Sequence, residues 1–243
     1  GNIGGDILHG GDGNDIIVSS GFYAELYGDA DNDIITTKGA FCTLDGGAGD
    51  DTLYGGVGME TIIGGSGADT IKSLGGSDTI ILGSDGAVDK VIFTDFKEAG
   101  AAGFASMHNT VTGFTSGQDM FIFDGKFKAA GLDDVTAKDG NFTFVTNAAA
   151  NFDTAHEALL KTGVADAALT QDGFSDLMDA LNAVGISAAK KGVDGLIVVQ
   201  SGTHTGIYTY IENGGNLNHI DAGELSLLAL VDGSIGTSSF DFA

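Results

Sequence analysis

The sequence lacks proline and has one cysteine, Cys42, so neither a disulfide within the chain nor a cysteine-based zinc site can stabilise its fold. It also lacks any apolar run that approaches the ~20 residues of a membrane-spanning helix. The first residues, Gly1 to Gly5, resemble neither an initiator region nor a secretory signal, and we expect residue 1 to be an internal cut in a longer protein. Another source of stability is needed.

Basic residues are scarce. Ten Lys and Arg stand against 34 Asp and Glu, which gives a formal net charge of −24. Nucleic acid and anionic membranes would repel such a chain, whereas cations would be attracted to it. Hydrophobic residues make up 42% of the sequence, which is enough for a packed core. We therefore expect the chain to fold once its charge is offset.

Glycine is abundant, with 41 residues, and residues 1–81 follow a period of nine. In nine rows counted from Gly1, the eighth position always holds Leu or Ile, and the sixth is acidic in seven rows. The aliphatic residues are Leu8, Ile17, Leu26, Ile35, Leu44, Leu53, Ile62, Ile71 and Ile80. The acidic residues are Asp6, Asp15, Asp33, Asp51, Glu60, Asp69 and Asp78. A flexible Gly/Asp-rich linker would not keep an aliphatic residue at every eighth position.

This pattern resembles the RTX family of calcium-binding repeats, whose nonapeptide reads Gly-Gly-x-Gly-x-Asp-x-aliphatic-x. The rows GGDGNDIIV (10–18) and GGAGDDTLY (46–54) follow it closely. The resemblance implies a calcium-binding repeat region in a secreted bacterial protein.

The physics of the repeat independently predicts a mainly β fold, a parallel β-roll. A glycine-rich turn of six residues and a strand of three form half a coil, and two halves enclose the eighth-position aliphatics in a narrow interior. Coils stack ~4.8 Å apart and hydrogen-bond only to their neighbours. Residues two rows apart therefore lie over one another. Their aspartates and turn carbonyls surround a shared gap lined by oxygen, the ligand atom that Ca²⁺ prefers.

Even-numbered rows share one edge of the roll, the even edge, and odd-numbered rows share the odd edge. The even edge keeps its aspartates and most of its glycines, so we predict three calcium sites there, between rows 2 and 4, 4 and 6, and 6 and 8. A fourth would combine Asp69 with Asp85 or Asp89. The predicted ligands of this edge are Gly11, Gly13, Asp15, Asp31, Asp33, Gly47, Gly49, Asp51, Gly65, Gly67, Asp69 and Asp89.

The odd edge is degenerate. Ala24 and Cys42 occupy the acidic position, so we predict no calcium in the middle of this edge and a site only between Glu60 and Asp78.

Aromatic residues stand in the degenerate odd turns. Tyr23 and Phe41 share a row position in adjacent coils and should stack, with Phe22 beside them. We weigh two interpretations: a contact surface for another subunit or ligand, and burial against the chain's own second region, which we favour.

Calcium is expected to control folding of the repeat. Without metal, the stacked carboxylates would repel one another and the glycines would lose much backbone entropy on ordering. Extracellular calcium modules are tuned to roughly 10⁻⁴–10⁻³ M. Such a chain would stay disordered in the cytosol and fold outside the cell.

Residues 94–243 are predicted to form a second domain, mixed but mainly β, which caps the roll of residues 1–93. A last, looser coil is predicted at 89–93. Residues 111–125 resemble the strand that often follows such repeats in the family. Hydrophobic alternation predicts further strands around Phe142 and Phe144, around Leu196 and Val198, and at 207–211. The spacing predicts a helix over 174–184 that ends at Gly185, and a weaker helical pattern covers 153–161.

The C-terminal end carries a second resemblance. No Lys or Arg follows Lys191, and the chain ends in GTSSFDFA. This end is similar to the uncleaved signal of family members exported by type I secretion. The resemblance implies the type I secretion machinery as a partner and the bacterial cell exterior as the location.

Catalytic patterns are absent from the sequence: no His-Glu-x-x-His pair, Gly-x-Ser-x-Gly elbow or phosphate-binding glycine loop occurs. We therefore predict no enzymatic activity. Our first hypothesis is a calcium-dependent structural module of a surface-layer or adhesin-type protein, with self-association into a surface lattice. Two alternatives stay open: the tail of a secreted hydrolase, epimerase or toxin, and a ligand-binding adhesin tip.

Overall fold

The computed structural model describes residues 4–94, 108–123, 144–146, 150–151, 158–169, 174–184, 186–187, 194–211, 220 and 224–242. The chain divides into two compact units. The first comprises Gly1–Thr94 and Asn109–Ile122, and the second comprises Asp95–His108 and Phe123–Ala243. We placed the boundary after residue 93, and the structure returns Asn109–Ile122 to the first unit.

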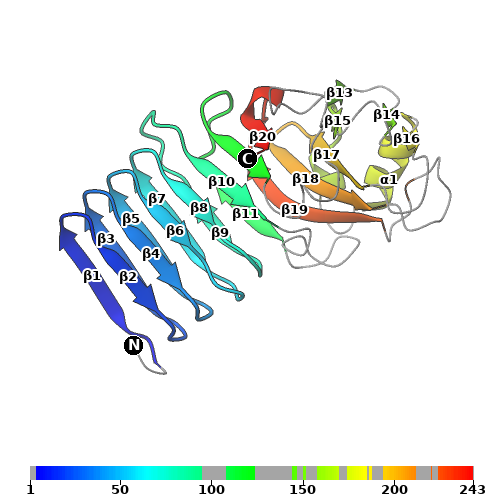
Figure 1. The fold of residues 1–243 in the computed structure, drawn as a ribbon. Coiled ribbons are helices and arrows are strands. Elements are labelled where there is room, and N and C mark those ends of the chain that lie inside the picture. Colours follow the sequence, from blue (N-terminus) through cyan, green and yellow to red (C-terminus); the bar gives the residue numbers. More distant parts are fainter. Residues whose placement is uncertain are drawn as a thin grey trace. The chain divides into compact units, whose positions relative to one another are not determined.

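The first unit is a parallel β-roll whose two series of strands alternate along the chain (Figure 1). The odd series contains β1 (Ile7–Asp12), β3 (Glu25–Ala30), β5 (Thr43–Ala48), β7 (Thr61–Ser66), β9 (Thr79–Ile81) and β11 (Asn109–Thr112). The even series contains β2 (Ile16–Ser19), β4 (Ile34–Thr37), β6 (Thr52–Tyr54), β8 (Thr70–Lys72), β10 (Lys90–Phe93) and β12 (Met120–Phe123). The parallel strands confirm the predicted fold class.

Strand register follows the repeat. Ile17 pairs with Ile35, and Leu53 with Ile71, which is the predicted offset of two rows. The offset grows where Ile71 pairs with Val91, and again where Ile80 pairs with Val111. Longer connections are therefore accommodated without loss of parallel pairing.

The interior of the roll is a double row of eighth-position side chains. Leu26, Ile35, Leu44, Leu53, Ile62, Ile71 and Ile80 are all fully buried. Val91, Val111 and Phe121 continue the two rows into the last coils, and the ring of Phe121 stacks on that of Phe93 with centroids 5.9 Å apart. One aliphatic residue per row is thus enough to fill the narrow core.

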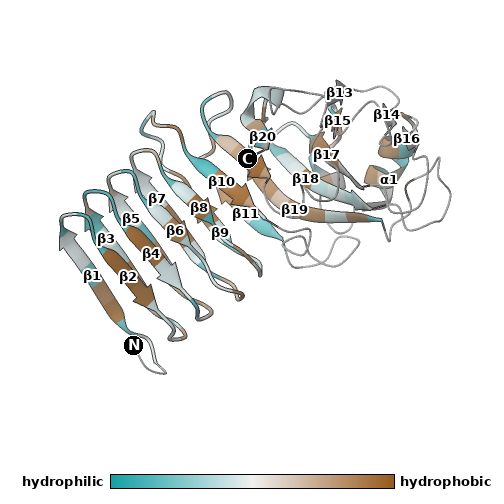
Figure 2. Cartoon of the chain, viewed as in Figure 1, coloured by the Kyte–Doolittle hydropathy of each residue, from teal (hydrophilic) through white to brown (hydrophobic). Residues whose placement is uncertain are grey.

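The first even strands also carry apolar residues, and β2 is coloured mostly brown in Figure 2. Ile16, Val18 and Ile34 are exposed there. Thr52 and Thr70 occupy the place of Ile16 and Ile34 in the following coils. Because threonine is a good strand former, the same position accepts either side chain.

The second unit is built on the antiparallel strands β17 (Asp194–Gln200), β18 (His204–Ile211) and β19 (Leu225–Asp232). β15 (Ala158–Lys161) pairs in parallel with β17 and with β13 (Phe144–Thr146), while β14 (Ala150–Asn151) pairs with β16 (Ile186–Ser187). The remaining elements are the 3₁₀ turns η3 (Asp166–Leu169) and η4 (Thr237–Ser239), the helix α1 (Phe174–Asn182) and the strand β20 (Phe240–Phe242). Leu177 and Leu181 of α1 pack in the core with Ile197 and Tyr208.

Several local predictions for this region can be compared with the structure. The strands at β10, β17 and β18 and the helix α1 are confirmed. The helical pattern over 153–161 is wrong for its last four residues, which form β15, because Leu159 and Leu160 are both buried in a strand paired on two sides. The rest of that pattern, Phe142 and Gly185 lie outside the described residues.

The single strand that we predicted at 111–125 is two strands, β11 and β12. Gly113 and Gly117 adopt positive φ values of 81° and 80°, which turn the chain between them. Among the described residues, no helix has the length and hydrophobicity required to span a membrane.

Candidate metal site

Carboxylates of the even edge lie one over another and are joined by backbone hydrogen bonds. The amide of Asp15 donates to Asp33 Oδ1 over 2.7 Å, and the amide of Asp33 donates to Asp51 Oδ1 over 2.7 Å. The amide of Asp51 donates to Asp69 Oδ1 over 2.9 Å, and that of Asp69 to Asp89 Oδ1 over 2.9 Å. We call this series the even ladder.

The ladder extends one rung beyond the prediction, to Asp119, whose Oδ1 accepts the amide of Asp89 over 3.0 Å. Its other oxygen accepts the amide of Thr115 over 2.7 Å. Sequence reasoning missed this residue, although Gly117, Asp119 and Phe121 keep the Gly-x-Asp-x-apolar spacing of a repeat row. At Asp119, backbone amides therefore bind both carboxylate oxygens.

The other oxygen of the first four rungs is buried and unsatisfied. Among the described residues, Oδ2 of Asp15, Asp33, Asp51 and Asp69 has no hydrogen-bond partner. An unpaired buried charge of this kind is strongly destabilising. The repetition of the same unpaired atom in four coils indicates that a cation belongs beside it.

Glycine at the first row position leaves space beside each unpartnered oxygen. A methyl group on Gly46 would collide with Asp51 Oδ2 and with the carbonyl oxygen of Gly64. A methyl group on Gly28 would collide in the same way with Asp33 Oδ2 and the Gly46 carbonyl. Each carboxylate oxygen thus shares a small space with a carbonyl oxygen of the next coil.

Carbonyl groups of the turns also point along the roll. The carbonyl oxygen of Gly47 occupies the space that a side chain on Gly65 would need, and the carbonyl oxygen of Gly49 does the same at Gly67. These predicted ligand positions require positive φ, 100° at Gly47 and 133° at Gly49. Glycine is therefore needed both for the backbone conformation and for the close approach of the next coil.

Row 4 departs from the glycine pattern. Asp29 and Asp31 take its positive-φ positions, at 75° and 71°. Asp31 Oδ2 accepts the amide of Gly13 over 3.0 Å, and Asp85 accepts the amide of Gly67 in the same manner. The predicted ligand Asp31 therefore already binds a turn amide of the neighbouring coil.

The intact end of the odd edge repeats the ladder arrangement. The amide of Glu60 donates to Asp78 Oδ1 over 2.9 Å, and the amide of Asp78 to Asn109 Oδ1 over 3.0 Å. Glu60 Oε1 and Asp78 Oδ2 are buried without a hydrogen-bond partner in the described part of the chain. The structure thus brings together the two residues predicted for this edge.

Uncharged side chains, those of Ala24 and Cys42, replace the carboxylates in the middle of the odd edge. The thiol of Cys42 donates to the Gly21 carbonyl over 3.3 Å, and both Cys42 and Ala24 are buried. No carboxylate is present at either position to attract a cation.

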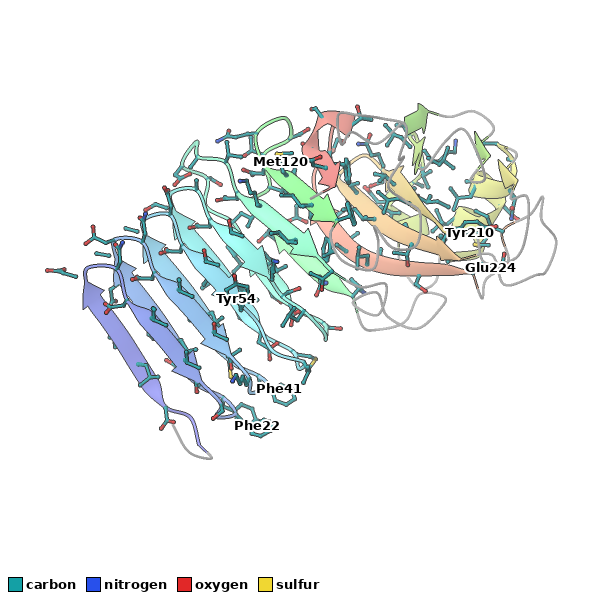
Figure 3. The ribbon with its side chains drawn as sticks, viewed as in Figure 1. Phe22, Phe41, Tyr54, Met120, Tyr210 and Glu224 are labelled. Carbon is teal, nitrogen blue, oxygen red and sulfur yellow. The ribbon has the colours of Figure 1, made fainter. Side chains whose placement is uncertain are left out.

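The aromatic residues of this edge form the predicted stack. The rings of Tyr23 and Phe41 have centroids 5.2 Å apart and planes inclined by 14°. Both side chains are exposed, at 64% and 44%, where we expected burial. Figure 3 shows Phe22 and Phe41 projecting outward from their turns. The positive φ values of Tyr23 and Phe41, 58° and 59°, direct the side chains away from the roll.

Burial and neighbouring carboxylates raise the pKa values of three carboxyl groups on the two edges, those of Asp69, Asp78 and Asp89. Burial raises the pKa of Asp69 to about 7, with a further contribution from the charges of Asp89 and Asp51. Burial raises the pKa of Asp78 to about 8, assisted by the charge of Glu60. The pKa of Asp89 rises to about 6 for the same reasons. Ionisation of these three carboxyl groups is therefore unfavourable in the absence of a cation.

The donor atoms fit Ca²⁺. They are carboxylate and carbonyl oxygens, which calcium prefers. Among the described residues, no group of three or more His, Cys, Asp or Glu side chains is placed to hold a metal, so backbone carbonyls have to complete the coordination. A side-chain site of the zinc type does not arise from the arrangement of these residues.

The raised pKa values predict that mild acid promotes folding of the calcium-free chain. A carboxyl group whose pKa is higher in the folded state stabilises it fully below the unfolded value of 3.8, and this stabilisation is lost as the pH rises through about 6 to 8. We expect the β signal of the chelated chain in circular dichroism to increase from pH 8.5 down to about pH 5.5. The double variant Asp69→Asn/Asp78→Asn should show a weaker pH dependence, and a signal that fell on acidification would contradict the assignment.

A comparison with known protein families indicates which ion these repeats bind. The RTX calcium-binding nonapeptide repeat, in four copies, matches residues 1–21, 43–58 and 54–86. This match confirms the resemblance drawn from the row pattern and identifies Ca²⁺ as the ion of these repeats. It leaves out 22–42, the segment with the aromatic odd turns and with Asp29 and Asp31. No curated protein matches the chain.

Proposed function

Because the N-terminal region consists of RTX calcium-binding repeats, we infer that this chain is the calcium-dependent structural module of a secreted cell-surface protein of the surface-layer type. The observation that supports this function is the even ladder. Its four buried, unpartnered carboxylate oxygens make the roll unstable at neutral pH until cations bind. Folding is thereby coupled to the calcium concentration of the surroundings.

We assign the binding of calcium to the gaps between adjacent even coils, with Asp15, Asp33, Asp51, Asp69 and Asp89 as carboxylate ligands. The carbonyls of the glycine positions beside them supply neutral oxygens. Glu60 and Asp78 hold an ion on the odd edge. Bound Ca²⁺ supplies the positive charge that the buried carboxylates lack. In the folded roll, the ladder hydrogen bonds fix one oxygen of each accepting carboxylate and leave the other available to the ion.

The burial of Phe240, close to residue 243, agrees with export of the chain before it folds. The Phe240 side chain is buried and stacks on Phe123 with centroids 6.5 Å apart. If the end of the chain is the type I secretion signal, then folding of the second unit hides one of its aromatic residues. Low cytosolic calcium would keep the repeats disordered during passage, and the higher calcium outside would fold them.

A calcium titration of the chelated chain tests the function. We expect disordered chain to convert to β structure with a midpoint of roughly 10⁻⁴–10⁻³ M Ca²⁺. Mg²⁺ at the same concentrations should be far less effective, because it requires a smaller and more regular octahedral shell. Circular dichroism follows the conversion, and hydrogen exchange locates it in β2 to β8. A β spectrum unchanged by thorough chelation would refute calcium control of folding.

A further inference from the structure

The exposed apolar side chains of the odd turns form one patch, which we call the aromatic edge patch. It contains Phe22, Tyr23, Phe41, Val57 and Met59, which are exposed by 49%, 64%, 44%, 82% and 49%. Figure 3 shows Phe22 and Phe41 of this patch standing clear of the roll. Contiguous exposed apolar surface on a soluble protein marks an interaction site.

The patch is held in place by the repeat. Tyr23, Phe41 and Met59 occupy the same row position in three successive coils, so their side chains follow one line along the edge. The amide of Tyr23 donates to the Ala40 carbonyl over 3.0 Å, which joins the first two turns. Tyr23 and Phe41 adopt a left-handed backbone that disfavours large side chains. Aromatic side chains that are strained, exposed and stacked on one another indicate a role other than packing in the interior of the roll.

The patch is also free of negative charge. The turns 19–24 and 37–42 contain no Asp or Glu, the one acidic residue of the turn 55–60, Glu60, is buried, and the only basic residue of the three turns is Lys38. This is unusual for a chain with a net charge of −24. Two copies that meet at this patch would therefore not place exposed carboxylates of these turns against one another.

We propose that the aromatic edge patch is a self-association surface, which packs against the same patch of a second copy of this chain. The proposal rests on the proposed function, since the patch forms only when calcium folds the roll. Five half-exposed side chains cover roughly 400 Å² per copy, because an aromatic side chain buries ~150–250 Å² when fully covered. The pair would bury roughly 800 Å², the size of a weak, transient interface. Such an interface becomes effective when many copies are held on one surface.

Sedimentation of the whole chain in saturating calcium tests the proposal. The weight-average mass should rise above the 24.5 kDa of one chain as the concentration increases. In the variant Tyr23→Asn/Phe41→Asn, the concentration at the midpoint of association should increase about tenfold or more. Asparagine tolerates the left-handed backbone, so this variant is expected to fold. Folding is checked separately by its calcium titration.

The matched control is Ile16→Thr/Ile34→Thr, which removes exposed apolar surface of similar size from the strands and should leave association unchanged. Wild-type chain that folds in calcium but stays monomeric would assign the patch to another kind of partner and overturn the proposal, with calcium-dependent folding intact. An equal loss of association in the control would show unspecific adhesion and overturn it as well. A chain that stayed unfolded in calcium would refute the proposed function and this proposal together.

Discussion

Replacement of Asp51 by asparagine should move the folding transition of the roll to a calcium concentration about tenfold higher or more. Asp51 is hydrogen-bonded to Asp33 on one side and to Asp69 on the other, and its Oδ2 is buried without a partner, so we expect it to contribute to the sites on both sides. At ten times the dissociation constant, each lost ion removes about 1.4 kcal/mol of stability, so two weakened sites remove up to about 3 kcal/mol. The asparagine carbonyl keeps the hydrogen bond from Asp33, but its amino group replaces the ligand oxygen.

The neighbouring carboxylate provides the matched control. Asp50 is exposed, and its Oδ1 accepts the amide of Ala68 over 2.8 Å. Asn32 makes the same kind of bond one coil earlier, to the amide of Asp50 over 2.8 Å, so Asp50→Asn changes the net charge equally and keeps the local contact. Asp51→Ala should be worse than Asp51→Asn, because it also removes the rung. Equal calcium midpoints for Asp50→Asn and Asp51→Asn, measured by circular dichroism and calorimetry, would remove Asp51 from the metal site.

A single methyl group at Gly46 should prevent the central coils from binding calcium. The added carbon would enter the space between Asp51 Oδ2 and the Gly64 carbonyl oxygen, and the second of these belongs to backbone that is fixed by strand pairing. Overpacking of this kind costs about 1–3 kcal/mol by itself. Displacement of the two oxygens removes calcium stabilisation in addition. We expect Gly46→Ala to leave β4, β5 and β6 largely unfolded in millimolar Ca²⁺.

Gly75→Ala is the corresponding control. Gly75 does not require positive φ, and a methyl group there would meet only the Val57 α-carbon, at an ordinary distance of 3.9 Å. The control should match the wild type in calcium midpoint and in hydrogen exchange. If Gly46→Ala bound calcium and protected β4 to β6 as the wild type does, the space beside Asp51 Oδ2 would not be part of the site.

The parts of the roll that follow the nonapeptide were predictable. An aliphatic residue in each row fixed the register of Ile17 with Ile35 and of Leu53 with Ile71, because only one stacking buries them all. The same register placed Tyr23 over Phe41 and Asp15 over Asp33. In a repeat whose units contact only their neighbours, positions in the sequence translate directly into positions in space.

Prediction was poorer where the row length changed or where tertiary packing decided the outcome. The connections before β10 and β11 lengthen the period, so Asp119 and the strands around it were not recognised as repeat rows. The segment 158–161 combines two leucines with helix-compatible neighbours, and only pairing with β13 and β17 made it a strand. The exposure of Tyr23 and Phe41 depends on a left-handed backbone that side-chain identity does not reveal.

The two edges of the roll differ in what holds successive coils together. In the middle of the odd edge, adjacent coils are joined without metal by the hydrogen bond from the Cys42 thiol to the Gly21 carbonyl and by the stacked rings of Tyr23 and Phe41. On the even edge, we expect a calcium ion between adjacent coils to hold them together. When calcium is withdrawn, unfolding should therefore begin at the even edge, and the metal-free contacts of the odd edge should be the last to separate.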